Sequence, residues 1–184
     1  MRIGIVSDTH GGYKDFMTAL EKMGDVDFIL HLGDVLYHGP RNDLPGTYEP
    51  KKLAEQIKSM GNIIFVRGNC DSEVDEMVTD KNIHENFRII DFGDIRIYAT
   101  HGHRESEDER VAAAENKFCD YLITGHTHIK KDVKTDTLHI LNPGSTTIPK
   151  DGSHSCAVID DDGVHFYEWW FESHFTWFFS PLVL

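Results

Sequence analysis

Five short segments of the 184-residue sequence carry polar side chains whose types suit metal binding. Each segment follows an apolar run, and together they contain Asp8, His10, Asp34, Asn69, His101, His126 and His128. A set of carboxylate, imidazole and amide groups suits a divalent transition metal ion better than calcium. The pair of Asp8 and His10 alone is better explained by a helix N-cap and a partly exposed imidazole, so only the whole set indicates a metal site.

The elements predicted around these side chains would bring them together. Residues 1–6, 26–32 and 62–67 are apolar runs typical of buried strands, whereas 13–23 and 51–60 have the apolar spacing of helices. The carboxyl ends of parallel strands meet at the crevice where open α/β sheets bind ligands. This βαβαβ order therefore predicts that the polar groups after the strands share one place.

The second half of the sequence is richer in predicted strands. Hairpins are expected within 86–100, 131–141 and 155–170, a helix at 105–117 and a buried strand at 121–123. Two sheets packed on each other with helices outside accommodate this order. Because no linker or repeat interrupts the sequence, we predict a single α/β domain over residues 1–184.

The composition restricts the partners. The formal net charge of −13 disfavours duplex nucleic acid and membranes, because few cations are available to neutralise phosphates over a broad surface. The sequence has no apolar run of about 18 residues and no basic-then-apolar leader. Three scattered cysteines fit free thiols in a reducing compartment. We expect a cytoplasmic protein with a small substrate.

The order of these motifs resembles that of the calcineurin-like metallophosphoesterases. The motifs are Asp-x-His, Gly-Asp, Gly-Asn-x-Asp, a histidine and Gly-His-x-His. Segments 33–42 and 67–75 are closer still to the YfcE-type bacterial phosphodiesterases, and the likeness runs from residue 1 to about residue 160. The resemblance implies the metallophosphoesterase fold, a four-layer α/β/β/α sandwich of two mixed sheets flanked by helices.

The resemblance also implies a cofactor and a reaction. The cofactor is two divalent metal ions, most readily Mn2+, with Fe, Zn, Ni or Co as alternatives. Asp8, His10 and His128 are similar to the family's ligands of the first ion. Asn69, His101 and His126 are similar to those of the second ion, and Asp34 is similar to the residue that bridges the two. The reaction is hydrolysis of small phosphodiesters through in-line attack by a hydroxide that bridges the metals.

One position departs from many members of the family. Many family members have the motif Gly-Asn-His, whose histidine stabilises the transition state or protonates the leaving group. This sequence has Cys70 in place of that histidine. A thiol replaces an imidazolium poorly, so we expect activated aryl diesters to react better than esters with basic alkoxide leaving groups. His103 and His38 are the alternative proton donors. Asp34, Asn69, Cys70 and His103 form the predicted catalytic set.

The long polar loop at 37–50 follows the bridging aspartate, and we expect it to form the substrate pocket. Its candidate binding residues are His38, Arg41 and Asn42, with Arg41 as a bidentate phosphate contact. The alternative for Arg41 is an ion pair within its own acidic loop.

The segment 165–184 is unusually aromatic, with nine Phe, Tyr and Trp residues. A subunit interface that gives a homo-oligomer, such as a dimer or tetramer, is one explanation. A divergent or frame-shifted end remote from the site is the other.

Two further functions compete with the phosphodiesterase. A non-catalytic protein-binding scaffold on the same fold is disfavoured, because suitable residues occupy all seven ligand positions. A nuclease would share the chemistry, but the acidic charge disfavours it.

Overall fold

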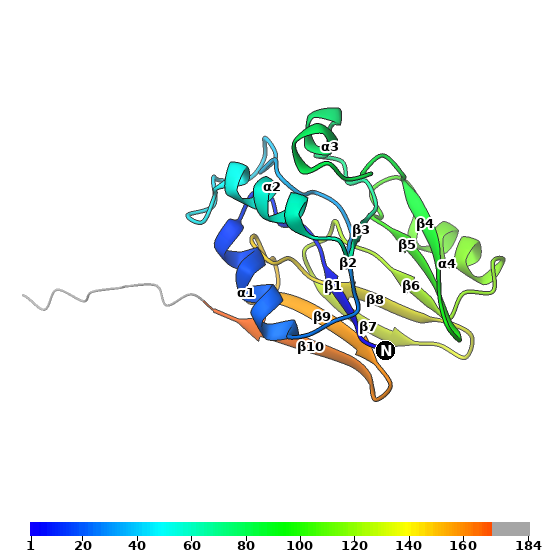
Figure 1. Cartoon of the computed structure of the whole chain (residues 1–184). Coiled ribbons are helices and arrows are strands. Elements are labelled where there is room, and N and C mark those ends of the chain that lie inside the picture. The colour runs from blue at the N-terminus through cyan, green and yellow to red at the C-terminus, as the bar shows by residue number, and fades with distance from the viewer. Residues whose placement is uncertain (171–184) are drawn as a thin grey trace, which may run out of the picture.

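The structure is a computed structural model, and it describes residues 1–170. In chain order its elements are β1 (Ile3–Val6), α1 (Tyr13–Met23), β2 (Phe28–His31), α2 (Pro50–Ser59), β3 (Ile63–Phe65), α3 (Glu73–Thr79), β4 (Phe87–Phe92), β5 (Ile95–Thr100), α4 (Glu107–Glu115), β6 (Tyr121–Ile123), β7 (Lys130–Lys134), β8 (His139–Pro143), β9 (His154–Asp160) and β10 (Gly163–Trp169). Two five-stranded sheets have the strand orders β10-β9-β1-β2-β3 and β4-β5-β6-β8-β7 (Figure 1).

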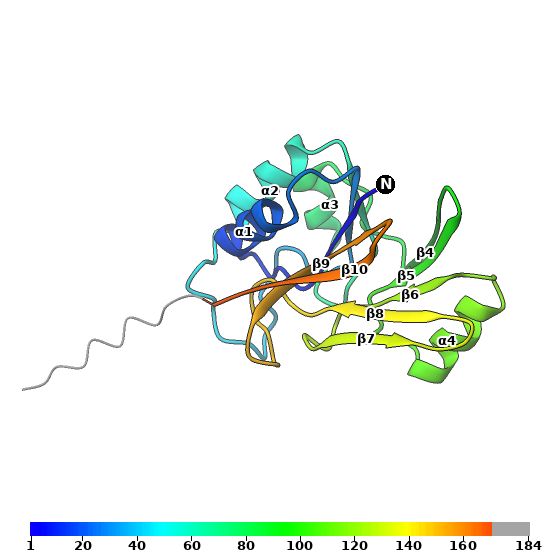
Figure 2. The same ribbon diagram turned by 90° about the horizontal axis from the view of Figure 1, so that it is seen from below.

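Alternation of side chains along the strands creates the layers. On β1, Ile3 and Ile5 enter the core between the two sheets, whereas Val6 enters the core beneath helices α1 and α2. A third core lies between the second sheet and α4. Helices α1 and α2 thus cover one sheet and α4 covers the other (Figure 2), which confirms the predicted four-layer α/β/β/α sandwich.

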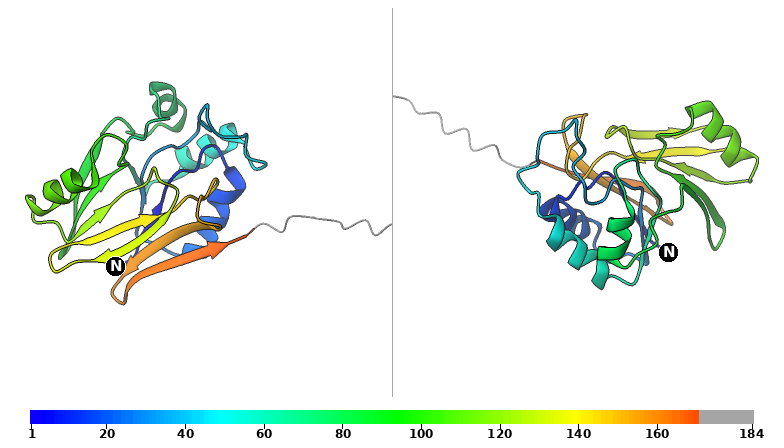
Figure 3. Two further views of the ribbon diagram at one scale, coloured as in Figure 1. Left: turned by 180° about the vertical axis from the view of Figure 1, so that it is seen from behind. Right: turned by 90° about the horizontal axis from the view of Figure 1, so that it is seen from above.

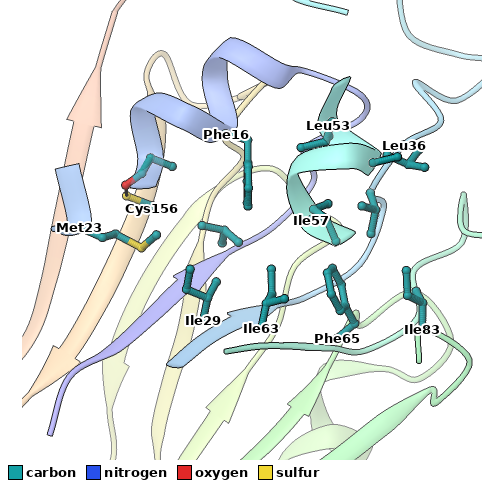
Figure 4. Close-up of a cluster of buried hydrophobic side chains, with 14 of the residues drawn as sticks. Phe16, Met23, Ile29, Leu36, Leu53, Ile57, Ile63, Phe65, Ile83 and Cys156 are labelled. Atoms are coloured by element: carbon teal, nitrogen blue, oxygen red, sulfur yellow. Dashed lines mark hydrogen bonds between the residues drawn. The ribbon is translucent and has the colours of Figure 1, made fainter. Parts of the chain in front are cut away.

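The core beneath α1 and α2 shows why these segments become helices. Phe16, Leu53 and Ile57 point from the two helices toward strands β2 and β3 (Figure 4), and all three are fully buried. Their spacing places them on one side of each helix, as the apolar pattern predicts. Each element predicted within residues 1–170 occurs, with its ends shifted by a residue or two.

Helix α3 is an element that the apolar pattern does not predict. Its Val74 and Met77 are 61% and 78% exposed, so the helix lacks an apolar stripe facing a core. A capping box starts it, in which the Asp75 carboxylate accepts hydrogen bonds from the backbone N–H and the hydroxyl of Ser72. The Ser-x-x-Asp spacing is therefore the sequence signal for this helix.

Strand direction determines where the polar segments lie. Strands β1, β2 and β3 run parallel, and so do β5, β6 and β8. The loops that follow parallel strands leave the sheet at the carboxyl ends of those strands (Figure 3). Both sheets therefore deliver their polar segments to one end of the sandwich.

The described part of the aromatic segment belongs to β10. Trp169 is buried, Tyr167 packs against the core beneath α1, and Phe166 packs against the core between the sheets. Residues 171–184 lie outside the described residues, so the subunit interface and the single domain over 1–184 stay predictions. Within residues 1–170 no helix is long and apolar enough to cross a membrane.

The burial of Phe16 leads to a stability prediction. Phe16→Ala should lower the free energy of unfolding by about 3–5 kcal/mol, because it leaves a cavity between α1 and the first sheet. Met77→Ala is the control, and its exposed side chain should change the value by less than about 0.5 kcal/mol. Urea unfolding measures both, and equal effects would contradict the assigned packing.

Candidate metal centre

The predicted ligands of the first ion lie together and are buried. The Oδ1 atom of Asp8 is 3.2 Å from Nε2 of His128 and 3.8 Å from Nε2 of His10. The two Nε2 atoms are 3.4 Å apart. Metal–ligand bonds of about 2.0–2.2 Å place ligand atoms roughly 3.0–3.6 Å from each other. Two of the three separations fall in this range and the third, from Asp8 to His10, is 3.8 Å, so a small adjustment would let the three atoms share one ion.

Backbone carbonyls fix the orientation of three of the histidines. Each Nδ1 lies within hydrogen-bond distance of one carbonyl oxygen, for His10 that of Tyr37 (2.8 Å), for His101 that of Leu32 (2.6 Å) and for His128 that of Ile148 (2.6 Å). A neutral imidazole that donates from Nδ1 carries its lone pair on Nε2. The three Nε2 atoms thus face the site, and each can bind a metal when its ring is neutral.

The two oxygens of Asp8 have different surroundings. Oδ2 accepts hydrogen bonds from the Ser7 hydroxyl and the His126 backbone N–H, whereas the buried Oδ1 has no hydrogen-bond partner among the described residues. Burial opposes ionisation of Asp8, but the neighbouring His128 and His101 outweigh it and lower its pKa. An ionised, buried oxygen beside two imidazole lone pairs is what a cation site requires.

Asp34 reaches both groups of predicted ligands. Its Oδ2 is 3.7 Å from Nε2 of His10 and 3.4 Å from Nε2 of His101, while Oδ1 accepts a hydrogen bond from the Cys70 backbone N–H. The Asn69 Oδ1 lies 3.2 Å from the same His101 nitrogen. Oδ2 of Asp34 is therefore placed as a bridging ligand would be.

The charges around His101 also indicate a cation. Burial disfavours protonation of His101, but Asp34 and Asp8 outweigh it and raise its pKa to about 9. Burial likewise opposes ionisation of Asp34, yet His101 holds the pKa of that carboxyl well below its usual range. Positive charge at His101 is thus stabilised beside the oxygens of Asp34 and Asn69, as it would be at a cation site.

His126 is less tightly placed than the other predicted ligands. Its ring centre is 5.1 Å from that of His101, and the side chain is partly exposed at the mouth of the site. Within the described residues it belongs to none of the compact groups of acidic, histidine and cysteine side chains. Its backbone N–H nevertheless bonds to Asp8, which keeps this loop beside the site.

Strained backbone is concentrated in the site. Five of the seven predicted ligands have positive φ angles: Asp8 (52°), His10 (40°), Asp34 (58°), His126 (68°) and His128 (59°). Among the other described residues that are not glycine, Asp80 and Phe118 alone share this conformation. It costs roughly 1–2 kcal/mol per residue, so the surrounding hydrogen bonds must hold the ligands in place.

Asp71 has a role that the sequence reasoning missed. Its carboxylate accepts hydrogen bonds from the backbone N–H groups of Asp34 (2.9 Å), Val35 (2.7 Å) and Gly68 (2.7 Å). Burial raises the pKa of Asp71 to about 6, so the group is ionised at neutral pH. It joins the loop after β2 to the loop after β3, and its place in the Gly-Asn-x-Asp motif was the available signal.

Close backbone approach requires glycine at position 68. A Cβ atom there would lie 2.1 Å from Oδ1 of Asp34 and 2.4 Å from its backbone nitrogen. The two loops therefore contact each other without side chains between them, which explains the glycine before Asn69.

A cleft of about 830 Å3 opens beside the predicted ligands. It is lined by the predicted substrate residues Arg41 and Asn42, and also by Tyr37, Thr127 and Lys150, which the sequence reasoning did not single out. Among the described residues, Arg41 forms no ion pair, so the alternative of a pair within its acidic loop finds no support.

His38 is placed beside the cleft rather than among its lining residues. Its ring packs edge-on against Tyr37 and Tyr48, with ring centres 4.8 and 5.4 Å away. Its carbonyl oxygen accepts a hydrogen bond from the Asn42 side chain. His38 thus shapes the loop that carries Asn42.

Neither Cys70 nor His103 is an effective proton donor at neutral pH, because the thiol is too weak an acid and the imidazole is already deprotonated. Burial and the neighbouring Asp34 raise the pKa of the Cys70 thiol to about 12. Burial, with the charge of His101, lowers the pKa of His103 to about 4, and its ring centre lies 5.3 Å from that of His101. Cys70 lines the cleft, whereas His103 lies behind His101 and His126.

Sequence comparison identifies the class of protein. Residues 1–163 match the calcineurin-like phosphoesterase superfamily domain, so the chain belongs to this family. The chain is 37% identical to phosphodiesterase YfcE of Escherichia coli over 166 residues, which are 88% of this chain and 89% of YfcE. It is 27% identical to a phosphodiesterase of Methanocaldococcus jannaschii over 176 residues, 91% of this chain and 98% of that one.

Solved structures agree. The structure of E. coli YfcE, described as a phosphoesterase, superposes with a TM-score of 0.79 at 34% identity over 89% of this chain and 91% of YfcE. Vps29 of Chaetomium thermophilum superposes with a TM-score of 0.65 at 19% identity over 91% of this chain and 90% of Vps29, a likeness that concerns the fold alone.

The position of Asp71 leads to a prediction about metal affinity. Asp71→Ala should weaken Mn2+ binding by about 10–100-fold, because the loops that carry Asp34 and Asn69 lose their common anchor. Titration calorimetry measures the affinity. Asp75→Ala is the matched control, since this buried carboxylate bonds only within the start of α3, and it should change the affinity by less than about twofold. Wild-type affinity in Asp71→Ala would refute the anchoring role.

Proposed function

We propose that this chain is a metal-dependent phosphodiesterase that hydrolyses small phosphodiesters at a two-metal site. One observation carries the proposal. Three histidines bonded through Nδ1 to backbone carbonyls direct Nε2 at carboxylate oxygens of Asp8 and Asp34, 3.2–3.8 Å away. The membership of the family and the curated phosphodiesterase relatives support the same activity.

The proposed ligand sets follow from this geometry. Asp8, His10 and His128 would hold one ion, and Asp34 would bridge to a second ion held by Asn69, His101 and His126. When bound, the two ions would activate water at neutral pH and neutralise negative charge on the phosphate. The mixed donor set suits Mn2+, our proposed native ion, and also Fe, Zn, Ni or Co.

The side chains around the ligands have separate tasks. Asp34 is oriented by the Cys70 N–H and by Asp71, which leaves Oδ2 directed at both histidine groups. Asn42 would contact the reacting ester from the loop after β2, and Arg41 on the same loop would bind the substrate elsewhere in the cleft. The buried imidazoles and carboxylates on the floor of the cleft would exclude bulk water from one side of the substrate phosphate. Electrostatic interactions there would be stronger because the local dielectric constant is lower than in water.

A scaffold function is the competing proposal, and the likeness to Vps29 shows that the fold occurs outside the named phosphodiesterases. Buried, strained ligand positions are costly to keep without a ligand, which supports the enzyme. Cytoplasmic location and a homo-oligomeric state, dimer or tetramer, stay predictions from the sequence.

The bridging role of Asp34 leads to an activity prediction. Wild-type protein with Mn2+ should release p-nitrophenol from bis(p-nitrophenyl) phosphate, and a chelator should stop the reaction. Asp34→Asn and Asn69→Ala should each lower kcat/KM by at least about 100-fold, because the first removes the negative charge and bridging oxygen of a proposed ligand and the second removes a ligand. Asp94→Asn changes an exposed acid in a hairpin turn and is the charge-matched control. Unchanged turnover in Asp34→Asn would refute the metal mechanism.

The neutral thiol at position 70 predicts a steep dependence on the leaving group. Across a series of methyl aryl phosphates, kcat/KM should fall by at least about 100-fold from the p-nitrophenyl to the phenyl ester, because no strong acid protonates the leaving oxygen. Cys70→His should make this dependence shallower, whereas Cys119→Ala, a buried cysteine beneath α4, should not. The same slope in all three proteins would show that Cys70 does not limit protonation.

A further inference from the structure

Two cations line the cleft beside the proposed metal ligands. Arg41 belongs to the loop after β2, and Lys150 belongs to the loop between β8 and β9. Both side chains are exposed, and neither forms an ion pair or a hydrogen bond with the residues that the structure describes. Asp34 alone is acidic among the described lining residues, and it is a proposed metal ligand.

Both loops are tied to the ligands. The Lys150 backbone N–H donates to the carbonyl oxygen of His128, at 3.0 Å, and the same loop supplies the Ile148 carbonyl that accepts from His128 Nδ1. On the other loop, the Tyr37 carbonyl accepts a hydrogen bond from Nδ1 of His10, and Asn42 donates hydrogen bonds to Gly39 and His38 within the loop. The two cations are therefore carried by segments with fixed positions relative to the site.

Their charge exceeds what the reacting phosphate needs. The two carboxylates among the proposed ligands offset about half of the charge of two divalent ions, and the remaining positive charge already exceeds the single negative charge of a phosphodiester. Arg41 and Lys150 are additional, in a protein whose net charge is −13. Unpaired cations in a cleft concentrate anionic ligands, and a guanidinium or ammonium forms charge-assisted hydrogen bonds with phosphate oxygens.

We propose that Arg41 and Lys150 form a second anion site in the cleft. The preferred substrates are then phosphodiesters in which one of the two alcohols joined by the diester carries an additional phosphate group. The reaction at the metal site rests on the proposed function. The anion site itself is a binding property, and it can be measured without turnover.

Two substrates that differ by one phosphate test the proposal. Thymidine 5′-(p-nitrophenyl phosphate) and its 3′-phosphorylated analogue have the same leaving group. The analogue should have a kcat/KM roughly tenfold higher, mainly through a lower KM. Arg41→Met and Lys150→Met should each reduce this preference by roughly three- to tenfold, whereas Lys150→Arg should keep it. Lys117→Met removes an exposed charge outside the cleft and should also keep it.

Calorimetry with products separates this site from the reaction. Thymidine 3′,5′-bisphosphate should bind roughly tenfold more tightly than thymidine 5′-phosphate, and the two Met variants should lose this difference. If this pattern appears without turnover of either ester, the anion site is supported and the phosphodiesterase is refuted. If both esters turn over with equal kcat/KM and both products bind equally, the anion site is refuted and the phosphodiesterase stands. A preference that both Met variants keep also overturns the assignment.

Discussion

The hydrogen bond from histidine Nδ1 to a backbone carbonyl is the interaction on which the site depends. It decides which nitrogen of His10, His101 and His128 has the lone pair, and it fixes the plane of each ring. The accepting carbonyls lie in loops at the end of the sandwich where parallel strands finish. Ring orientation is thus a property of the backbone, and the rings do not need an ion to be held in place.

Hydrogen bonds between site residues and backbone groups also join the two sheets. His101 follows a strand of the second sheet, but its Nδ1 bonds to Leu32 at the end of β2 in the first sheet. In the other direction, Asp8 after β1 accepts from the backbone of His126, which follows β6. The core between the sheets determines their separation, and the polar contacts at the rim determine their register there. Packing and site geometry are therefore parts of one structure.

The sequence predicted the architecture and supplied the proposed residues of the site, but it did not reveal the contacts that support them. Strands and helices with apolar periodicity were recognisable because burial imposes that period on the side chains. Helix α3 escaped prediction since Val74 and Met77 are exposed and give it no apolar face. The anchor Asp71 and the cation Lys150 were missed for a related reason. Their roles come from contacts between loops far apart in sequence, and the place of Asp71 in the Gly-Asn-x-Asp motif does not by itself show which groups it contacts.

The left-handed backbone at Asp8, His10, Asp34, His126 and His128 has a consequence for folding. Glycine adopts this conformation at a lower free energy than these residues do. Without bound metal, the protein would therefore have this backbone strain with no metal coordination to offset it. Ions that bind only the folded state offset such a cost in proportion to the logarithm of their concentration. Metal supply would therefore act on the free energy of unfolding, and the proposed ions would have a structural role beside their role in hydrolysis.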